Sequence, residues 1–468
     1  MMRGLVLGAV LAALTAQQAQ AQIRPDQAAF RALYKELVET NTTLSSGSCT
    51  LAAERLAARM KAAGYAEKDL TVFSTPEKPK EGGLVAILPG TSRKAKPILL
   101  LGHLDVVEAN RADWTRDPFT LIEEGGYFYA RGASDDKAQS AIWTDTLIRF
   151  RQEGFKPKRT IKLALTCGEE TTTAFNGAGW LAKNRRELID AEYALNEGGG
   201  GLVGPDGTRS VLSMQVGEKT VANFRLETTN PGGHSSMPRP DNAIYSLATA
   251  LNRVGRYEFP VQFSDTTRSF FSRLAPTLPP KMSGAVTALL ANQEDKAADA
   301  LVSMDPTLHS TLRTTCVATM LDGGHAMNAL PQRARAIVNC RIFPGNTPQS
   351  VQATLANAIS DPQVAISQII EDRPLASPPP LSPKIFGPAE KLAAEMFPGV
   401  PILPTMSTGA TDGIFLGAIG IPTYGVPGIF YDADGGGIHG LNERIRVKSL
   451  YDGRDYLFRL VKIYANQN

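Results

Sequence analysis

A run of apolar residues, Pro97–Leu101, leads directly into Gly102 and His103. Such an uninterrupted run is typical of a strand buried on both faces of a parallel sheet, because an exposed face would require alternating polar residues. Residues 160–166 and 192–196 are interpreted as two further buried strands. Strands that alternate with helices predict an α/β fold with a mainly parallel sheet flanked by helices.

Two helices are expected beside these strands. Ser48 is a suitable N-cap for a helix from Thr50 to about Ala63. A second helix should follow Asp136, where large apolar residues recur at helical spacing as far as Phe150.

The pattern changes from residue 218 onward. Alternating strands and amphipathic helices on one antiparallel sheet predict a separate α+β domain. We therefore expect a catalytic domain made of residues 22–217 and 374–468, interrupted by an inserted domain over 218–373. The inserted domain contains a polar, helical-looking segment, residues 257–313, whose role the sequence does not reveal. The strands and helices expected in the inserted domain cover 220–228, 241–254, 315–320, 334–342 and 349–359.

Charge and the N-terminus limit the partners and the compartment. The formal charge of +3 is nearly balanced and no basic run occurs, so nucleic acid is not expected as a partner. Residues 1–21 combine Arg3, a short apolar stretch and Ala19-Gln20-Ala21, which predicts a cleaved signal peptide. The expected protein is exported, periplasmic or secreted, without stable membrane association after cleavage. An uncleaved membrane anchor is the alternative.

An exported chain can form disulfides, and this one has four cysteines. Cys316 and Cys340 flank a glycine turn and could face each other across a hairpin, although the sequence does not fix the register. Cys49 and Cys167 have no predicted partner. Four buried free thiols are the alternative.

Side chains that bind divalent metals follow the expected strands. His103 and Asp105 follow the first, Glu169-Glu170 the second and Glu197 the third. The carboxyl ends of parallel strands meet at one edge of a sheet, so these groups should lie close together. Asp135 and His439 complete a donor set that suits zinc, with cobalt or manganese as alternatives. The pattern indicates a two-metal hydrolase.

Six short motifs follow one another along the chain. They are Gly102-His103-Leu104-Asp105-Val106-Val107, Ala130-Arg131-Gly132-Ala133-Ser134-Asp135-Asp136-Lys137, Cys167-Gly168-Glu169-Glu170, Asn196-Glu197-Gly198-Gly199, Gly232-Gly233-His234-Ser235-Ser236 and Ile438-His439-Gly440. Any single motif is weak, whereas the ordered set is specific. In this order the motifs resemble those of the M20 metallopeptidase family, and the resemblance extends over nearly all of the mature length. The branch of carboxypeptidase S and the N-acyl-amino-acid hydrolases is the most similar.

The resemblance implies two Zn²⁺ ions per chain that share the carboxylate of Asp135. One ion would be held by His103, Asp135 and Glu197, and the other by Asp135, Glu170 and His439. A shared carboxylate holds two cations at the short separation that two-metal hydrolysis needs.

The resemblance also implies two catalytic carboxylates. Glu169 would act as general base on a metal-activated water, while Asp105 would accept the far ring N–H of His103. Glu169 and its neighbour Glu170 can have different tasks, because consecutive residues on an extended segment point in opposite directions.

Further implied residues lie in the inserted domain, which would serve as lid and dimerisation domain. His234 would stabilise the oxyanion, often across a dimer interface, so a homodimer is expected; a surface turn histidine is the alternative. Arg341 would anchor a free carboxylate, although Asn339 stands where the family more often has Asp. Asn328 and Gly409 match substrate-side positions, and His309 and His325 are interpreted as structural or surface residues.

The function expected from the resemblance is a two-zinc carboxypeptidase that cleaves the amide next to the free carboxylate of a short peptide. The alternatives are an N-acyl-amino-acid amidohydrolase and a dipeptidase. A metal-dependent binding protein without turnover would be expected to lack the base, whereas Glu169 is present.

Overall fold

The computed structural model describes residues 24–171, 175–370, 373–375 and 377–467. The expected signal peptide, residues 1–21, lies outside the described residues. Within them, no helix has both the length and the apolar character needed to cross a membrane.

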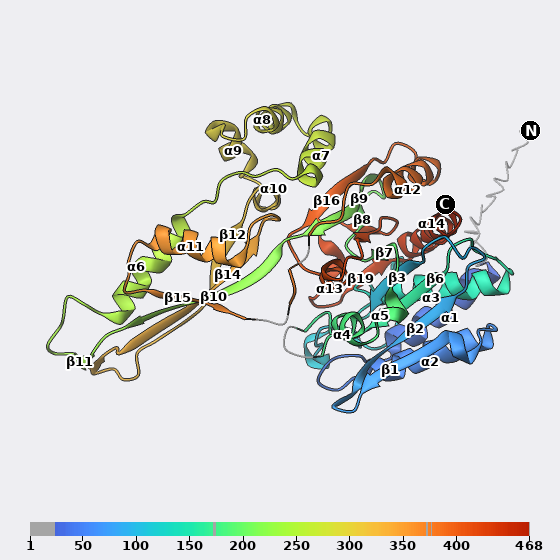
Figure 1. Ribbon diagram of the computed structural model, residues 1–468, viewed down its shortest axis with the longest axis horizontal. Coiled ribbons are helices and arrows are strands. Elements are labelled where there is room, and N and C mark those ends of the chain that lie inside the picture. The colour runs from blue at the N-terminus through green and yellow to red at the C-terminus, as the bar shows by residue number, and fades with distance from the viewer. Residues whose placement is uncertain (1–23, 172–174, 371–372, 376, 468) are drawn as a thin grey trace, which may run out of the picture.

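A ten-stranded sheet forms the centre of the larger part of the molecule (Figure 1). The strand order is β1-β2-β6-β3-β7-β17-β9-β8-β18, and β16 pairs with β9. The middle strands β6, β3, β7 and β17 are parallel, whereas β1, β2 and the β8–β9 pair run antiparallel. The strands are β1 (Leu70–Thr75), β2 (Lys78–Leu88), β3 (Ile98–His103), β6 (Ile161–Thr166), β7 (Tyr193–Asn196), β8 (Gly200–Val203), β9 (Arg209–Glu218), β16 (Ile402–Ser407), β17 (Thr423–Gly425) and β18 (Phe430–Asp432).

Helices cover both faces of this sheet, which explains the apolar run that opens β3. Ile98 and Leu100 pack into one hydrophobic cluster, with α1, α2, α3, α12 and α14. Leu99 and Leu101 pack into the cluster on the opposite face, with α4, α5 and α13. The helices are α1 (Pro25–Glu39), α2 (Cys49–Ala62), α3 (Lys137–Gln152), α4 (Gly177–Asn184), α5 (Arg186–Ile189), α12 (Pro383–Met396), α13 (Gly413–Ala418) and α14 (Val447–Ala465).

The predicted α/β class is confirmed, and the elements expected from local patterns lie within a few residues of their predicted bounds. Ser48 caps α2, since its Oγ accepts the N–H of Leu51 at 3.1 Å. Small elements join the main ones: β4 (Ile122–Glu124), β5 (Tyr127–Tyr129), β19 (Arg444–Arg446), η1 (Glu67–Asp69), η2 (Arg111–Asp113) and η4 (Gly435–Gly437).

A second, four-stranded antiparallel sheet lies to one side, with the order β12-β14-β10-β15 (Figure 1). Apolar residues of α6 and α11 share one hydrophobic cluster with this sheet, and a two-stranded ribbon extends its far end. This arrangement matches the α+β architecture expected for the inserted domain. The boundaries of that domain, at residues 218 and 373, stay a prediction. The elements are α6 (Ala243–Arg256), α11 (Pro348–Ile359), β10 (Thr220–Thr229), β11 (Gly233–His234), β12 (Thr315–Gly323), β13 (Ala329–Leu330), β14 (Arg333–Ile342) and β15 (Ala365–Ile369).

The segment 257–313 is helical, as expected, but it is not merely polar. It has its own hydrophobic cluster around Phe271, Val286 and Leu289. It also packs on the ten-stranded sheet, since Thr266 Oγ1 donates to the carbonyl of Val216 at 3.2 Å. Its elements are α7 (Asp265–Leu274), η3 (Ala275–Thr277), α8 (Pro280–Ala291), α9 (Lys296–Val302) and α10 (Pro306–Thr311).

All four cysteines are paired in disulfides. Cys316–Cys340 links β12 to β14, as the hairpin reading suggested. Cys49–Cys167 links the start of α2 to the residue after β6, a pair that the sequence reasoning did not predict. The alternative of four free thiols is wrong for this structure. The second pair was missed because its members are 118 residues apart and meet only through tertiary packing.

Candidate metal centre

The side chains expected to bind metal gather at the carboxyl edge of the parallel strands. β3 ends at His103, β6 leads to Glu169 and Glu170, and β7 leads to Glu197. Ligand atoms of His103, Glu169 and Glu197 all lie within 4.8 Å of one another. The strand topology therefore brings residues from distant parts of the chain into one cluster.

His103 is buried, with 1% of its surface exposed, and both of its ring nitrogens face acceptors. Nε2 lies 3.1 Å from Asp135 Oδ1 and 3.8 Å from Glu197 Oε2. Nδ1 lies 3.0 Å from the backbone carbonyl of Asp105, whose carboxylate Oδ1 is farther away, at 3.7 Å. The carbonyl of Asp105 is thus the nearest acceptor for the Nδ1 hydrogen, which leaves Nε2 directed at the cluster.

Asp135 lies between the two histidines. Its Oδ1 faces His103, and its Oδ2 lies 3.2 Å from Nε2 of His439. His439 Nε2 also lies 2.9 Å from Glu170 Oε2. The backbone of His439 is left-handed, with φ of 59°, an uncommon state for a residue other than glycine, and it presents the ring to these carboxylates.

The donor set suits divalent cations. Hydrogen bonds to Asp135 and Glu170 raise the pKa of His439 to about 10. Burial opposes the charged form of His103, yet Glu197 and the neighbouring aspartates raise its pKa well above the usual range. An anionic cluster that draws protons onto two histidines would equally favour divalent cations, which histidine and carboxylate ligands bind.

Glu169 stands beside the cluster on a fixed segment. Burial, reinforced by the charge of Glu197, raises the pKa of Glu169 well above its usual range. The carboxylate of Asp105 accepts the backbone N–H groups of Glu170 at 3.0 Å and of Glu169 at 3.4 Å. Gly168, with φ of 95°, allows the turn, because a Cβ there would collide with the carbonyl of Phe175.

Glu443 organises the loop that carries Asp135, and sequence reasoning missed it. Its buried carboxylate accepts N–H groups of Gly132, Ser134 and Asp135 at 3.0, 2.8 and 3.1 Å. Arg131 NH1 also donates to it, at 2.8 Å. No motif around residue 443 announces this role, which depends on a contact across about three hundred residues.

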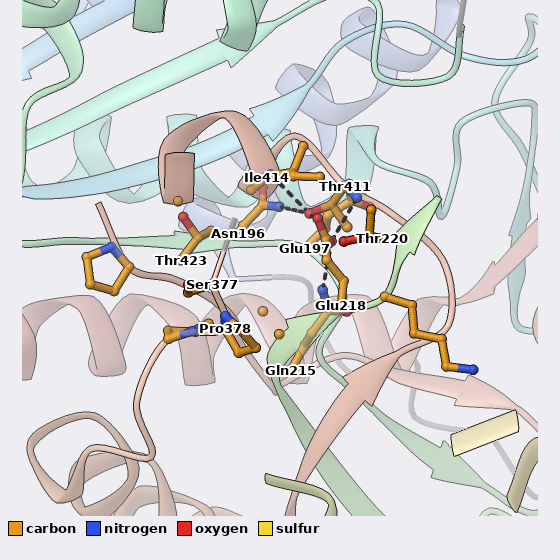
Figure 2. A pocket seen from close by; sticks show the side chains of 17 residues that line it. Asn196, Glu197, Gln215, Glu218, Thr220, Ser377, Pro378, Thr411, Ile414 and Thr423 are labelled. Carbon is orange, nitrogen blue, oxygen red and sulfur yellow. Dashed lines mark hydrogen bonds between the residues drawn. The ribbon is translucent and has the colours of Figure 1, made fainter. Parts of the chain in front are cut away.

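A small cavity of about 40 Å³ is lined in part by Glu197, and Figure 2 shows its lining. Glu218 Oε2 accepts from the backbone N–H and Oγ1 of Thr411, at 2.9 and 3.1 Å. Thr411 Oγ1 in turn accepts from Asn196 at 3.2 Å. Burial raises the pKa of Glu218 to about 8, against the hydrogen bonds from Thr411. Sequence reasoning missed Glu218 because it lies within an ordinary strand pattern.

The residues expected to contact substrate fall into two groups. Arg341 lies at the junction of the two sheets, 3.5 Å from the carbonyl of Thr408 and thus beside Gly409. His234 and Asn328 lie together at the far end of the smaller sheet, where the N–H of Ser235 donates to the Asn328 carbonyl at 3.1 Å. Figure 1 shows that β11, which contains His234, is remote from β3 and β7. Within one chain, therefore, this conformation keeps His234 and Asn328 away from the cluster.

The two histidines without a motif lie outside the cluster. His325 is exposed between β12 and β13, and His309 is partly buried on α10.

A histidine and carboxylate cluster at the carboxyl edge of an α/β sheet, with an acid beside it, defines a class of metal-dependent hydrolase folds. The model for peptidase family M20/M25/M40 matches residues 99–463. The chain belongs to this family, and it is a hydrolase of the metallopeptidase type.

Individual relatives are similar at moderate identity. A protein of Dictyostelium discoideum named "Probable carboxypeptidase S-like 2" is 29% identical over 385 residues, which is 80% of this chain and 72% of that protein. The human N-fatty-acyl-amino acid synthase/hydrolase PM20D1 is 28% identical over 405 residues, 84% of this chain and 79% of that protein. Among solved structures, an M20 family metallo-carboxypeptidase of Sulfolobus solfataricus superposes with a TM-score of 0.67 at 19% identity, covering 93% of this chain and 99% of that one. The last comparison supports the fold.

Proposed function

We propose that this protein is a two-metal hydrolase that cleaves the amide bond next to a free carboxylate. The observation that carries the proposal is the position of Glu169. Its carboxylate has no ion-pair partner among the described residues, and it lies beside the proposed metal ligands His103 and Glu197. Arg341 supports the carboxylate requirement, because its guanidinium lies at the junction of the two sheets and a guanidinium fork suits a carboxylate.

The ligands divide as the family resemblance implies. His103, Asp135 and Glu197 would hold one zinc ion, and Asp135, Glu170 and His439 the other. Bound metal would lower the pKa of a water molecule and polarise the scissile carbonyl. Glu169 takes the proton of that water and returns it to the leaving nitrogen. Asp105 holds the backbone of both glutamates in place.

His234 is proposed to take part in catalysis although it does not lie at the cluster of its own chain. Because it is remote from its own cluster in this conformation, we place it in the site of a second copy or in a closed state of the lid. A homodimer through the inserted domain satisfies the first option. The exposed apolar residues Val317, Met320 and Leu321 on the edge strand β12 support such an interface.

Export to an oxidising compartment is part of the proposal. Two disulfides among the described residues support it, since disulfides persist in periplasmic and extracellular proteins.

The test is hydrolysis of a matched panel by zinc-reconstituted protein. The panel contains blocked dipeptides, free dipeptides and N-acyl amino acids, each with a free or an amidated C-terminus. Turnover of the free carboxylates alone supports the Arg341 anchor, and Arg341→Lys should then raise KM more than it lowers kcat. Equal turnover of amidated substrates contradicts the anchor.

The panel also separates the alternatives. A preference for blocked peptides supports a carboxypeptidase, a preference for N-acyl amino acids an amidohydrolase, and a requirement for a free amine a dipeptidase. Metal-loaded protein that binds panel members without cleaving any of them would support the binding-protein alternative.

A further inference from the structure

The buried carboxylate of Asp412 has no task in the proposed mechanism. Asp412 directly precedes α13, yet its side chain does not cap that helix. Only 3% of the residue is exposed to solvent. A carboxylate is costly to bury unless it is hydrogen-bonded, so the partners of Asp412 show what it holds in place.

Two hydrogen bonds join Asp412 to both sides of the motif Cys167-Gly168-Glu169-Glu170. Thr166, the last residue of β6, donates its hydroxyl to Asp412 Oδ2 at 2.7 Å. Asn176, the N-cap of α4, donates from Nδ2 to Asp412 Oδ1 at 2.7 Å. Because Thr166 comes directly before the motif and Asn176 follows it, one carboxylate connects the two flanks of the segment that carries Glu169.

Asn176 extends this support into the motif itself. Its Nδ2 also donates to the carbonyl of Gly168 at 3.2 Å, and its Oδ1 accepts the N–H of Gly179 at 2.7 Å. Both sides of the amide are therefore engaged, which fixes its orientation. Gly168 directly precedes Glu169, so the amide that Asp412 holds is in contact with the backbone that directs the proposed base.

The loop that ends at Asp412 also reaches the proposed carboxylate anchor. Arg341 NH1 lies 3.5 Å from the carbonyl of Thr408, at the other end of this loop. Thr408 and Asp412 are four positions apart in the sequence. One short loop thus contacts both the anchor and the segment of the base.

We propose that Asp412 is a positioning residue, which sets the place of Glu169 relative to the metal ligands and to the anchor at Arg341. The inference rests on the proposed function. Asp412 acts through Thr166 and Asn176 and has no chemical step of its own. A displacement of about 1 Å lowers a rate about 10²-fold, so loss of these hydrogen bonds should affect kcat far more than KM.

The first test compares Asp412→Ala with Asp412→Asn in zinc-reconstituted protein, using the best substrate of the panel. Asp412→Ala removes both hydrogen bonds, and we expect kcat to fall about 10- to 100-fold while KM stays within about threefold of wild type.

Asp412→Asn is the conservative variant. Its amide can accept from Asn176 and donate to Thr166 Oγ1, whose own hydrogen can then go to the carbonyl of Gly102, 3.2 Å away. We expect kcat to recover to within about fivefold of wild type. An asparagine variant as slow as the alanine variant, or a rise in KM as large as the loss in kcat, would overturn the proposal.

The matched control is Asp145→Ala on α3. Asp145 is buried to a similar degree, with 4% exposed, and its Oδ2 accepts from Arg454 at 2.8 Å. Arg454 keeps a second partner, Asp26, so the variant should fold with reduced stability. At a temperature at which both alanine variants are folded, Asp145→Ala should keep kcat within about twofold of wild type. An equal loss of kcat in both would contradict a specific role of Asp412.

A double variant tests the connection through Thr166. Thr166→Val removes the hydroxyl that donates to Asp412 and keeps the shape of the side chain. Alone it should lower kcat, whereas in the Asp412→Ala background it should lower kcat no further, because the shared hydrogen bond is already absent. Full additivity of the two losses would contradict the shared role.

Hydrogen exchange separates this inference from the proposed function. In metal-free protein, backbone N–H groups in a peptide that covers residues 164–171 should exchange about tenfold faster in Asp412→Ala than in wild type. Asp145→Ala should leave that exchange unchanged.

The outcomes differ for the two proposals. Local acceleration in a protein that hydrolyses no panel member would contradict the proposed hydrolase and support the hold of Asp412 on the segment. Turnover by the wild type with unchanged exchange in Asp412→Ala, or with faster exchange but unchanged kcat, would contradict the positioning role and leave the hydrolase standing.

Discussion

Glu169 and Glu170 are neighbours in sequence, and we propose different tasks for them. Glu170 contacts His439 and belongs to the proposed ligand set, whereas Glu169 stands beside Glu197 without an ion-pair partner of its own among the described residues. We expect Glu169→Gln to retain its metal and to lose about 10²–10⁴-fold in kcat, because the proton shuttle is removed. Metal content by mass spectrometry and steady-state kinetics check this.

The matched variant is Glu170→Gln, which should lose metal as well as activity. Activity of Glu169→Gln within a few-fold of wild type would refute its assignment as the base.

The buried carboxylate of Glu443 supports the loop of Asp135 from outside the ligand set. Glu443→Ala removes the ion-pair partner of Arg131 and the acceptor of three backbone N–H groups, so the free energy of unfolding should fall by about 3–5 kcal/mol. We also expect weaker metal binding, because Asp135 loses the hydrogen bond at its own N–H. Denaturant unfolding and metal titration measure the two effects, and Glu443→Gln should recover part of both. Unchanged metal affinity in Glu443→Ala would contradict the positioning role.

Glu218 predicts a pH dependence of stability. Its pKa is raised to about 8 in the folded chain, so the folded state holds a proton that the unfolded state has released between about pH 5 and pH 8. The part of the folding stability that depends on protonated Glu218 is therefore fully present below that window, and it is lost as the pH rises through about 8. In metal-free protein, Glu218→Gln should gain stability relative to wild type across the window. Unfolding midpoints at several pH values test this, with the exposed Glu294→Gln as control; parallel profiles for all three proteins would exclude the effect.

At the scale of elements, the Cys49–Cys167 disulfide ties α2 to the segment that carries Glu169. Replacing both cysteines with alanine should lower the free energy of unfolding by about 2–5 kcal/mol. The matched pair Cys316/Cys340 closes a loop of 24 residues instead of 118. Chain entropy then predicts that its removal costs about 1.4 kcal/mol less. Denaturant unfolding of both double variants measures the two losses in the free energy of unfolding. A larger loss for the shorter loop would contradict the entropic argument.

The element that the sequence described least well is the segment 257–313. Its helices were recognisable, but its hydrophobic cluster and its position on the ten-stranded sheet were not. Helical periodicity reports which face of a helix is apolar, and it does not report which neighbour that face contacts.

At the scale of the whole molecule, the smaller sheet exposes an unpaired edge. The exposed fractions of Val317, Met320 and Leu321 on β12 are 58%, 67% and 71%. We expect Met320→Lys to shift a homodimer to monomer, since a charged side chain on an edge strand opposes pairing. Sedimentation velocity over a range of concentrations measures the shift. Val72→Lys, on the edge strand β1 of the other sheet, is the control, and a wild-type monomer throughout would exclude the dimer.

The sequence alone determined the α/β class, most strand and helix positions, and the order of the ligands. It could do so because strand burial and helix capping depend on near neighbours, and because parallel strands place their carboxyl ends at one edge. Local pattern thus sufficed to group His103 with Glu170 and Glu197.

Only the tertiary structure decided the contacts that join distant segments. Those are the Cys49–Cys167 bond, the support of Asp135 by Glu443, and the separation of His234 from the cluster. The hydrogen bonds of Asp412 belong with them, since β6, α4 and the start of α13 meet only after the chain has folded. None of these features has a local periodicity or motif, because each depends on the packing of side chains from elements far apart in the chain.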